Sequence, residues 1–66
     1  MNIVLNGEPR RLDGPNTLAG LVEMLGLDVR KVAIERNLEI APRSTYGRTS
    51  LSEGDRIEIV HFIGGG

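Results

Sequence analysis

The sequence predicts a small α+β domain in which one helix packs on a mostly antiparallel sheet. Two periodicities lead to this class: short segments alternate apolar and polar residues as strands do, and one segment repeats apolar residues at helical spacing. A third observation is size, because the chain has 66 residues and no cysteine. Such a chain forms one domain with a single small core, and neither disulfides nor cysteine-ligated zinc can stabilise it.

A β-hairpin is expected at the N-terminus. Ile3 and Leu5 share one face of a short alternating segment that ends at Asn6-Gly7. Asn-Gly is the strongest two-residue hairpin signal, because both central positions of a type I′ turn need positive φ. The return strand would be "EPRRLD". Its Pro9 cannot donate to a neighbouring strand, which predicts a place at the sheet edge.

The single helix is expected in "TLAGLVEMLGL", residues 17–27. Four apolar residues fall at i, i+3, i+4 and i+7 and form one stripe: Leu18, Leu21, Val22 and Leu25. Thr17 can cap the N-terminus, and Gly26 suits a left-handed position just after the C-terminus. Gly20 costs the helix about 1 kcal/mol relative to alanine. Close packing of the helix on the sheet would explain that glycine.

Two strands and a long connection are expected after the helix. "KVAIERN" places Val32 and Ile34 on one face, and the short "LEIAP" follows. The connection "RSTYGRTSLSEGD" has no clear periodicity, and we expect Tyr46 and Leu51 to hold it on the core. It ends in a Glu-Gly-Asp turn signal.

The last strand, "RIEIVHFI", is the most apolar segment, and we expect it at the sheet centre beside the first strand. Ile57 and Ile59 point one way, whereas Val60 and Phe62 point the other. This order of elements favours a β-grasp, or ubiquitin-like roll, with a mixed four- to five-stranded sheet on one helix. A ferredoxin-like or other small α+β roll is the alternative. Residues 1–63 would form the domain and residues 64–66 a flexible glycine tail.

Composition argues against several functions. Eight Lys and Arg oppose nine Asp and Glu, and their signs alternate along the chain, which disfavours nucleic-acid binding. No apolar run approaches the roughly 20 residues of a membrane span. The N-terminus does not resemble a secretory signal, so a cytoplasmic protein is expected. His61 is the single histidine. It has no identifiable partner, so we expect no catalytic residues and no metal site.

The terminal glycines remain to be explained. The chain opens with Met1, which suggests a complete gene product whose glycines form a real C-terminus. Frayed residues are one interpretation. Alternatively, Gly64, Gly65 and Gly66 reach roughly 10 Å beyond the domain and, lacking Cβ atoms, pass through a narrow channel in a partner. They would deliver the α-carboxylate of Gly66, a poor electrophile until a partner activates it, for example with ATP.

An apolar surface precedes these glycines at the end of the last strand. It consists of Val60 and Phe62, with Ile63 beside them. An exposed apolar strand that leads to a chain end is typical of a protein contact. The alternative is that Phe62 folds back onto the core.

Four segments together resemble the ThiS family of sulfur carriers in thiazole biosynthesis: "VLNGEPRRL", "TLAGLVEMLGL", "VAIERNLEIAPRS" and "LSEGDRIEIVHFIGGG". The resemblance runs from Met1 to Gly66. It implies a β-grasp carrier without catalytic activity or a cofactor of its own. It also implies a ubiquitin-activator-like adenylating enzyme (ThiF type) that uses ATP and magnesium to form an acyl adenylate at Gly66. A cysteine desulfurase or sulfurtransferase then supplies sulfur for a thiocarboxylate, and thiazole synthase (ThiG type) consumes it.

The resemblance carries over to single positions. The family's diglycine falls on Gly65 and Gly66, whereas only some members have a glycine matching Gly64. Leu38 stands where many members have a small or polar residue after Asn37, so a tight type I′ turn is not expected there. Three alternatives stay open for function. They are a sulfur carrier for molybdopterin, tRNA thiolation or cysteine synthesis, a ubiquitin-like protein modifier, and a plain interaction module.

Overall fold

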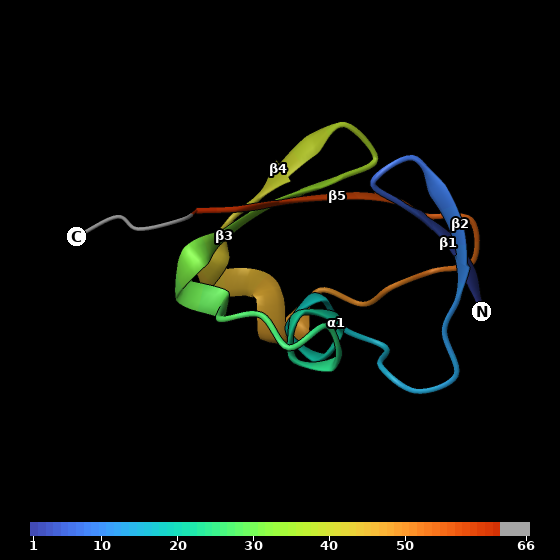
Figure 1. Cartoon of the computed structure of the whole chain (residues 1–66), viewed down its shortest axis with the longest axis horizontal. Coiled ribbons are helices and arrows are strands. Elements are labelled where there is room, and N and C mark those ends of the chain that lie inside the picture. Colours follow the sequence, from blue (N-terminus) through green and yellow to red (C-terminus); the bar gives the residue numbers. More distant parts are fainter. Residues whose placement is uncertain (63–66) are drawn as a thin grey trace.

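Residues 1–62 are described by the computed structural model, in which helices cover one face of a sheet (Figure 1). The elements in chain order are β1 (Asn2–Leu5), β2 (Glu8–Arg11), α1 (Leu18–Met24), the 3-10 helix η1 (Val29–Lys31), β3 (Val32–Arg36), β4 (Glu39–Ala41), the 3-10 helix η2 (Arg43–Arg48) and β5 (Arg56–His61). The strand order is β2-β1-β5-β3-β4. β1 and β5 run parallel, and the other neighbours run antiparallel. This is the predicted β-grasp roll with β5 at its centre.

The N-terminal hairpin is confirmed. Leu5 pairs with Glu8, which leaves a two-residue turn whose φ values are +50° at Asn6 and +83° at Gly7. Ile3 and Leu5 are buried, as the alternation predicts. β2 lies at the sheet edge, as predicted. An edge strand has a neighbour on one side only, so its open side needs no N–H group from Pro9.

The turn between β3 and β4 differs from the prediction. Arg36 pairs with Glu39, so Asn37 and Leu38 alone form the turn, and their φ values are +53° and +71°. Both central residues therefore have the positive φ of a type I′ turn, and the expectation that this turn is absent is wrong. The reason is Asn37, whose Oδ1 accepts from Arg56 N at 2.9 Å and whose N–H donates to Arg56 O at 2.8 Å. These bonds fix the turn on β5 despite the leucine.

Both caps of α1 are confirmed. The Thr17 hydroxyl accepts a hydrogen bond from Gly20 N at 3.1 Å. At the other end Gly26 has φ +73°, and Leu27 N donates to Val22 O at 3.1 Å, as in a Schellman motif. The caps satisfy backbone groups that a helix of 7 residues otherwise leaves open at both ends.

Gly20 does not serve the packing of helix on sheet. A Cβ atom at this position would lie 3.1 Å from Pro15 Cβ and 3.3 Å from Thr17 Oγ1. The expected reason for the glycine is therefore wrong. Its missing side chain makes room for the loop that leads into the helix.

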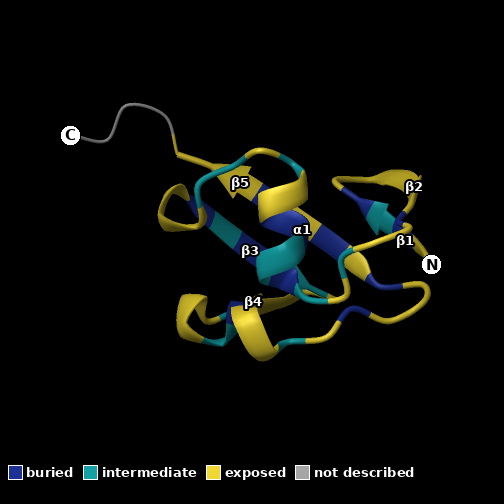
Figure 2. Ribbon diagram, turned by 90° about the horizontal axis from the view of Figure 1, so that it is seen from below, coloured by how far each residue is buried: buried dark blue, intermediate teal, exposed yellow. Residues whose placement is uncertain are grey.

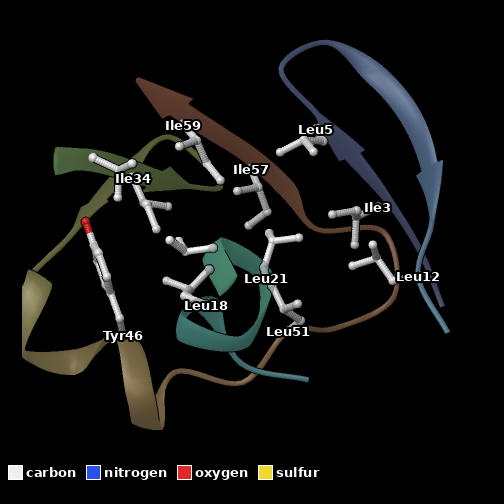
Figure 3. Packing of buried hydrophobic residues seen from close by; sticks show 12 residues of the cluster. Ile3, Leu5, Leu12, Leu18, Leu21, Ile34, Tyr46, Leu51, Ile57 and Ile59 are labelled. Carbon is white, nitrogen blue, oxygen red and sulfur yellow. The ribbon is translucent and has the colours of Figure 1, made fainter. Parts of the chain in front are cut away.

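The core lies between the sheet and α1 (Figure 3). Figure 2 shows the buried residues concentrated on the central strands and the sheet-facing side of the helix. The cluster consists of Ile3, Leu5, Leu12, Leu18, Leu21, Val22, Val32, Ile34, Tyr46, Leu51, Ile57 and Ile59. Tyr46 and Leu51 hold the long connection on the core, as predicted, but the 3-10 helix η2 was not predicted there.

Candidate functional site

β5 is the element that positions the candidate site, because it carries the chain from the core to the C-terminal end. Ile57 and Ile59 point into the core with exposed fractions of 0% and 9%. Ile59 N donates to Asn6 Oδ1 at 2.8 Å, and Phe62 N donates to Lys31 O at 2.7 Å. The backbone is therefore held against its neighbours as far as Phe62, and its direction there is fixed by the sheet.

The apolar residues predicted at this end of β5 lie at the surface. Val60 is 59% exposed and Phe62 is 48% exposed. Of the two interpretations of Phe62, packing into the core is therefore wrong. Contact of Val60 and Phe62 with a partner stays a prediction. Ile63, Gly64, Gly65 and Gly66 lie outside the described residues, so the predicted tail and the modified Gly66 stay predictions as well.

Within residues 1–62 no group of three or more His, Cys, Asp and Glu residues could hold a metal ion. His61 is exposed at the end of β5. No helix of this part of the chain has the length and hydrophobicity that a membrane crossing requires.

A buried carboxylate fixes the start of β5, and sequence reasoning missed it. Asp55 is 5% exposed. It accepts hydrogen bonds from Arg36 Nε at 3.0 Å, Asn37 Nδ2 at 3.0 Å and Ser52 N at 2.8 Å. The sequence predicts only that Asp55 belongs to a turn. Its side-chain partners lie 19 and 18 residues away, so no local pattern could reveal them.

The electrostatics of Asp55 follow from these contacts. Burial disfavours the charged form, but the hydrogen bonds from Asn37, Ser52 and Arg36 outweigh it and hold the pKa of Asp55 below its usual value. The carboxylate is thus ionised at neutral pH. It joins the turn before β5 to the β3–β4 turn and so sets the register from which β5 runs toward the C-terminal end.

Comparison with known proteins identifies relatives over the whole chain. The model of the ThiS family matches residues 3–66. The sulfur carrier protein ThiS of Bacillus subtilis is 42% identical over 50 residues, which are 76% of each chain. The crystal structure of the thiamine biosynthesis protein ThiS from Geobacter metallireducens superimposes with a TM-score of 0.83 at 32% identity and covers 100% of both chains.

Longer proteins also contain a segment related to this chain. A thiazole synthase of Paramagnetospirillum magneticum is 52% identical over 66 residues, which are 100% of this chain and 20% of that protein. The chain spans about a fifth of the length of that protein and of a thiazole synthase from Magnetococcus marinus, which is 53% identical over 66 residues. The Geobacter structure has the fold described above, and the family match and the Bacillus relative agree with it in sequence, so the chain belongs to the ThiS family.

Proposed function

We propose that this chain is a sulfur carrier of thiamine biosynthesis and that partner enzymes, not the chain itself, perform the catalysis. The observation that carries the proposal is the family match, which extends through residue 66. The central strand β5 supports it, because it is the last strand before the terminal glycines. Residues 1–63 act as the folded carrier domain. Gly64, Gly65 and Gly66 act as its flexible tail, and the cargo is held at the carboxyl group of Gly66.

The chemistry follows from that carboxyl group. A carboxylate is unreactive toward sulfur nucleophiles, so an adenylating enzyme of the ThiF type first joins a Gly66 oxygen to the α-phosphorus of ATP and releases pyrophosphate. Magnesium, held with ATP by that enzyme, offsets the phosphate charge. Sulfur at the oxidation level of sulfide then displaces AMP and leaves a thiocarboxylate. A cysteine desulfurase or sulfurtransferase carries this sulfur as a persulfide, and a second thiol, itself oxidised to a disulfide, supplies the two electrons that bring the sulfur to the sulfide level. Because adenylation consumes ATP, the cytoplasm is the compartment that we propose.

Thiazole synthase is the acceptor that we propose. Support comes from the relatives in which a thiazole synthase contains a segment more than half identical to this chain. Val60, Phe62 and Ile63 form the docking surface beside the tail. The exposure of Val60 and Phe62 leaves both side chains free for such a contact. Gly64, Gly65 and Gly66 then enter the partner's channel, where a side chain would not fit.

Rescue of thiamine auxotrophy tests this function. A cell without its own sulfur carrier should grow without thiamine when it expresses the 66-residue chain and should fail when Gly65 and Gly66 are deleted. Equal rescue by the truncated chain would favour a plain interaction module. Higher-mass conjugates on target lysines would favour a protein modifier. Rescue of molybdopterin synthesis or tRNA thiolation, without rescue of thiamine synthesis, would assign the carrier to another pathway.

A further inference from the structure

The face of the sheet opposite α1 is not covered by any described element (Figure 1). Ile40 on β4 is 79% exposed there, and Val60 on β5 is 59% exposed. Together with Ala33, Glu35 and Glu58 they line a shallow hollow of about 130 Å³. We call these five residues the outer face. Large apolar side chains so far from the core contribute little to folding, and their grouping is typical of a contact surface.

Two carboxylates lie opposite one another on the outer face. Glu35 on β3 pairs with Glu58 on β5. Asn37 N donates to Arg56 O, and Phe62 N donates to Lys31 O. Hydrogen-bonded pairs recur at every second residue of an antiparallel ladder, so Glu35 and Glu58, two residues from Asn37 and Arg56, also form a hydrogen-bonded pair. In such pairs the Cα atoms lie about 5.5 Å apart, and like charges directly opposite one another destabilise a sheet. Neither glutamate takes part in an ion pair with the described residues. No ion pair among the described residues therefore offsets this repulsion.

The turn beside the outer face carries a second unfavourable residue. Leu38 has φ +71° and is 75% exposed. A left-handed conformation costs a residue with a Cβ atom roughly 1–2 kcal/mol, and glycine would avoid that cost. A side chain so exposed gains little packing in return. The bonds between Asn37 and Arg56 hold the turn, but they would do so equally with glycine at position 38, so the exposed leucine points to a contact outside the chain.

We propose that the outer face, with Leu38 at its border, docks on a protein surface that presents an arginine or lysine within an apolar patch. The partner's cation would lie between Glu35 and Glu58 and relieve their repulsion, while Ile40 and Val60 contact the apolar patch around that cation. Desolvated charge pairs of this kind fix the register of an interface and exclude wrong partners. Val60 belongs both to the outer face and to the docking surface near the tail, so the two surfaces are continuous.

The partner to which the proposal commits is thiazole synthase, so the proposal rests on the function proposed above. In the matched thiazole synthases the related segment and the enzyme share one polypeptide. Their contact is then intramolecular and needs little intrinsic affinity. When a carrier and its acceptor lie on two polypeptides, complementary charge raises the rate of their encounter and the specificity of the contact.

Isothermal titration of the unmodified 66-residue chain with thiazole synthase tests the proposal. Glu58→Lys should raise Kd by about tenfold or more, because it brings a cation against a cation in a desolvated contact. Ile40→Ser should also weaken binding. Between low and high salt, Kd should rise less steeply for the double variant Glu35→Gln/Glu58→Gln than for the natural chain, because the charge pair is gone.

Matched controls separate the outer face from general effects. Glu39→Lys is the control for Glu58→Lys: it makes the same charge change next to Ile40, but the alternation of β4 points its side chain to the other side of the sheet. Met24→Ser is the control for Ile40→Ser, because it shortens an exposed apolar side chain on α1. Both should change Kd by less than about twofold. Circular dichroism should show every variant folded. An unchanged Kd for Glu58→Lys and Ile40→Ser would overturn the proposal, as would weakening only toward the adenylating enzyme. Sulfur transfer to Gly66, measured separately, would still test the function itself.

Discussion

Replacing Asp55 by alanine removes the carboxylate that joins the turn before β5 to the β3–β4 turn. The change deletes three hydrogen bonds, from Arg36, Asn37 and Ser52, at 3.0, 3.0 and 2.8 Å. The Arg36 side chain is 32% exposed, so water can partly replace its lost partner. We therefore expect a loss of about 2–3 kcal/mol in the free energy of unfolding, less than the cost of breaking a fully buried ion pair.

That loss is large for this protein. A core of this size supplies only about 3–5 kcal/mol of stability, and each kcal/mol shifts Tm by about 4–8 °C in a small domain. Tm should thus fall by about 10–20 °C in a thermal melt followed by circular dichroism. Asp13→Ala is the control, because its ion pair with Arg11 is 77–78% exposed and should be worth less than about 0.5 kcal/mol. A Tm change for Asp55→Ala no larger than that of the control would refute the reasoning.

The same carboxylate predicts a dependence on pH. The pKa of Asp55 is lowered in the fold, from 3.8 in the absence of its partners, so its ionised form stabilises the protein above about pH 4. This stability is lost as the pH falls through the lower pKa of the folded state. Asp55→Asn removes that proton uptake, so unfolding free energies measured between pH 2 and 5 should vary less with pH than those of the natural chain. An unchanged pH dependence would contradict the assignment.

Three further substitutions test separate parts of the structure by urea unfolding. Leu38→Gly should raise the free energy of unfolding by about 0.5–1 kcal/mol, because the relieved strain at φ +71° exceeds the cost of the added chain entropy. The same change should weaken binding to thiazole synthase. A lower free energy of unfolding would contradict the strain. Thr17→Ala removes the cap of α1 and should cost about 1 kcal/mol, whereas Thr17→Ser should cost little. Ile57 is 0% exposed, so Ile57→Ala should cost about 2–5 kcal/mol and bring the chain close to its limit of stability; a loss under about 1 kcal/mol would contradict its place in the core.

Local signals predicted the elements of the fold well. The Asn6-Gly7 pair predicts its hairpin because two adjacent positive φ values are required and both residues tolerate them. The alternation in the last strand predicts which side chains enter the core because the strand has one buried face. Thr17 and Gly26 predict the ends of the helix because caps act within one turn.

Three of the failures share one physical cause, which is contact between residues far apart in the sequence. The β3–β4 turn takes its form from Asn37 and Arg56, and local preference at Leu38 does not decide it. The partners of Asp55 become visible only when β3 and the turn before β5 are brought together. The opposition of Glu35 and Glu58 likewise depends on strand register, which periodicity alone does not give.

The candidate site was predicted in part. Exposure of Val60 follows from strand alternation, and the exposure of Phe62 needed the structure to decide between surface and core. The role of Gly66 came from resemblance to a family, because a glycine carboxylate has no side-chain chemistry from which a function could be derived. The acidic part of the outer face was not predicted at all.

Mass spectrometry of the C-terminal peptide tests the central claim most directly. The 66-residue chain would be incubated with the adenylating enzyme, ATP, magnesium and a sulfur donor, and a parallel sample would lack ATP. The account predicts that one oxygen is replaced by sulfur, only with ATP and only in the peptide that ends at Gly66. An unchanged mass with enzymes that are active on another carrier, or sulfur bound elsewhere in the chain, would contradict it.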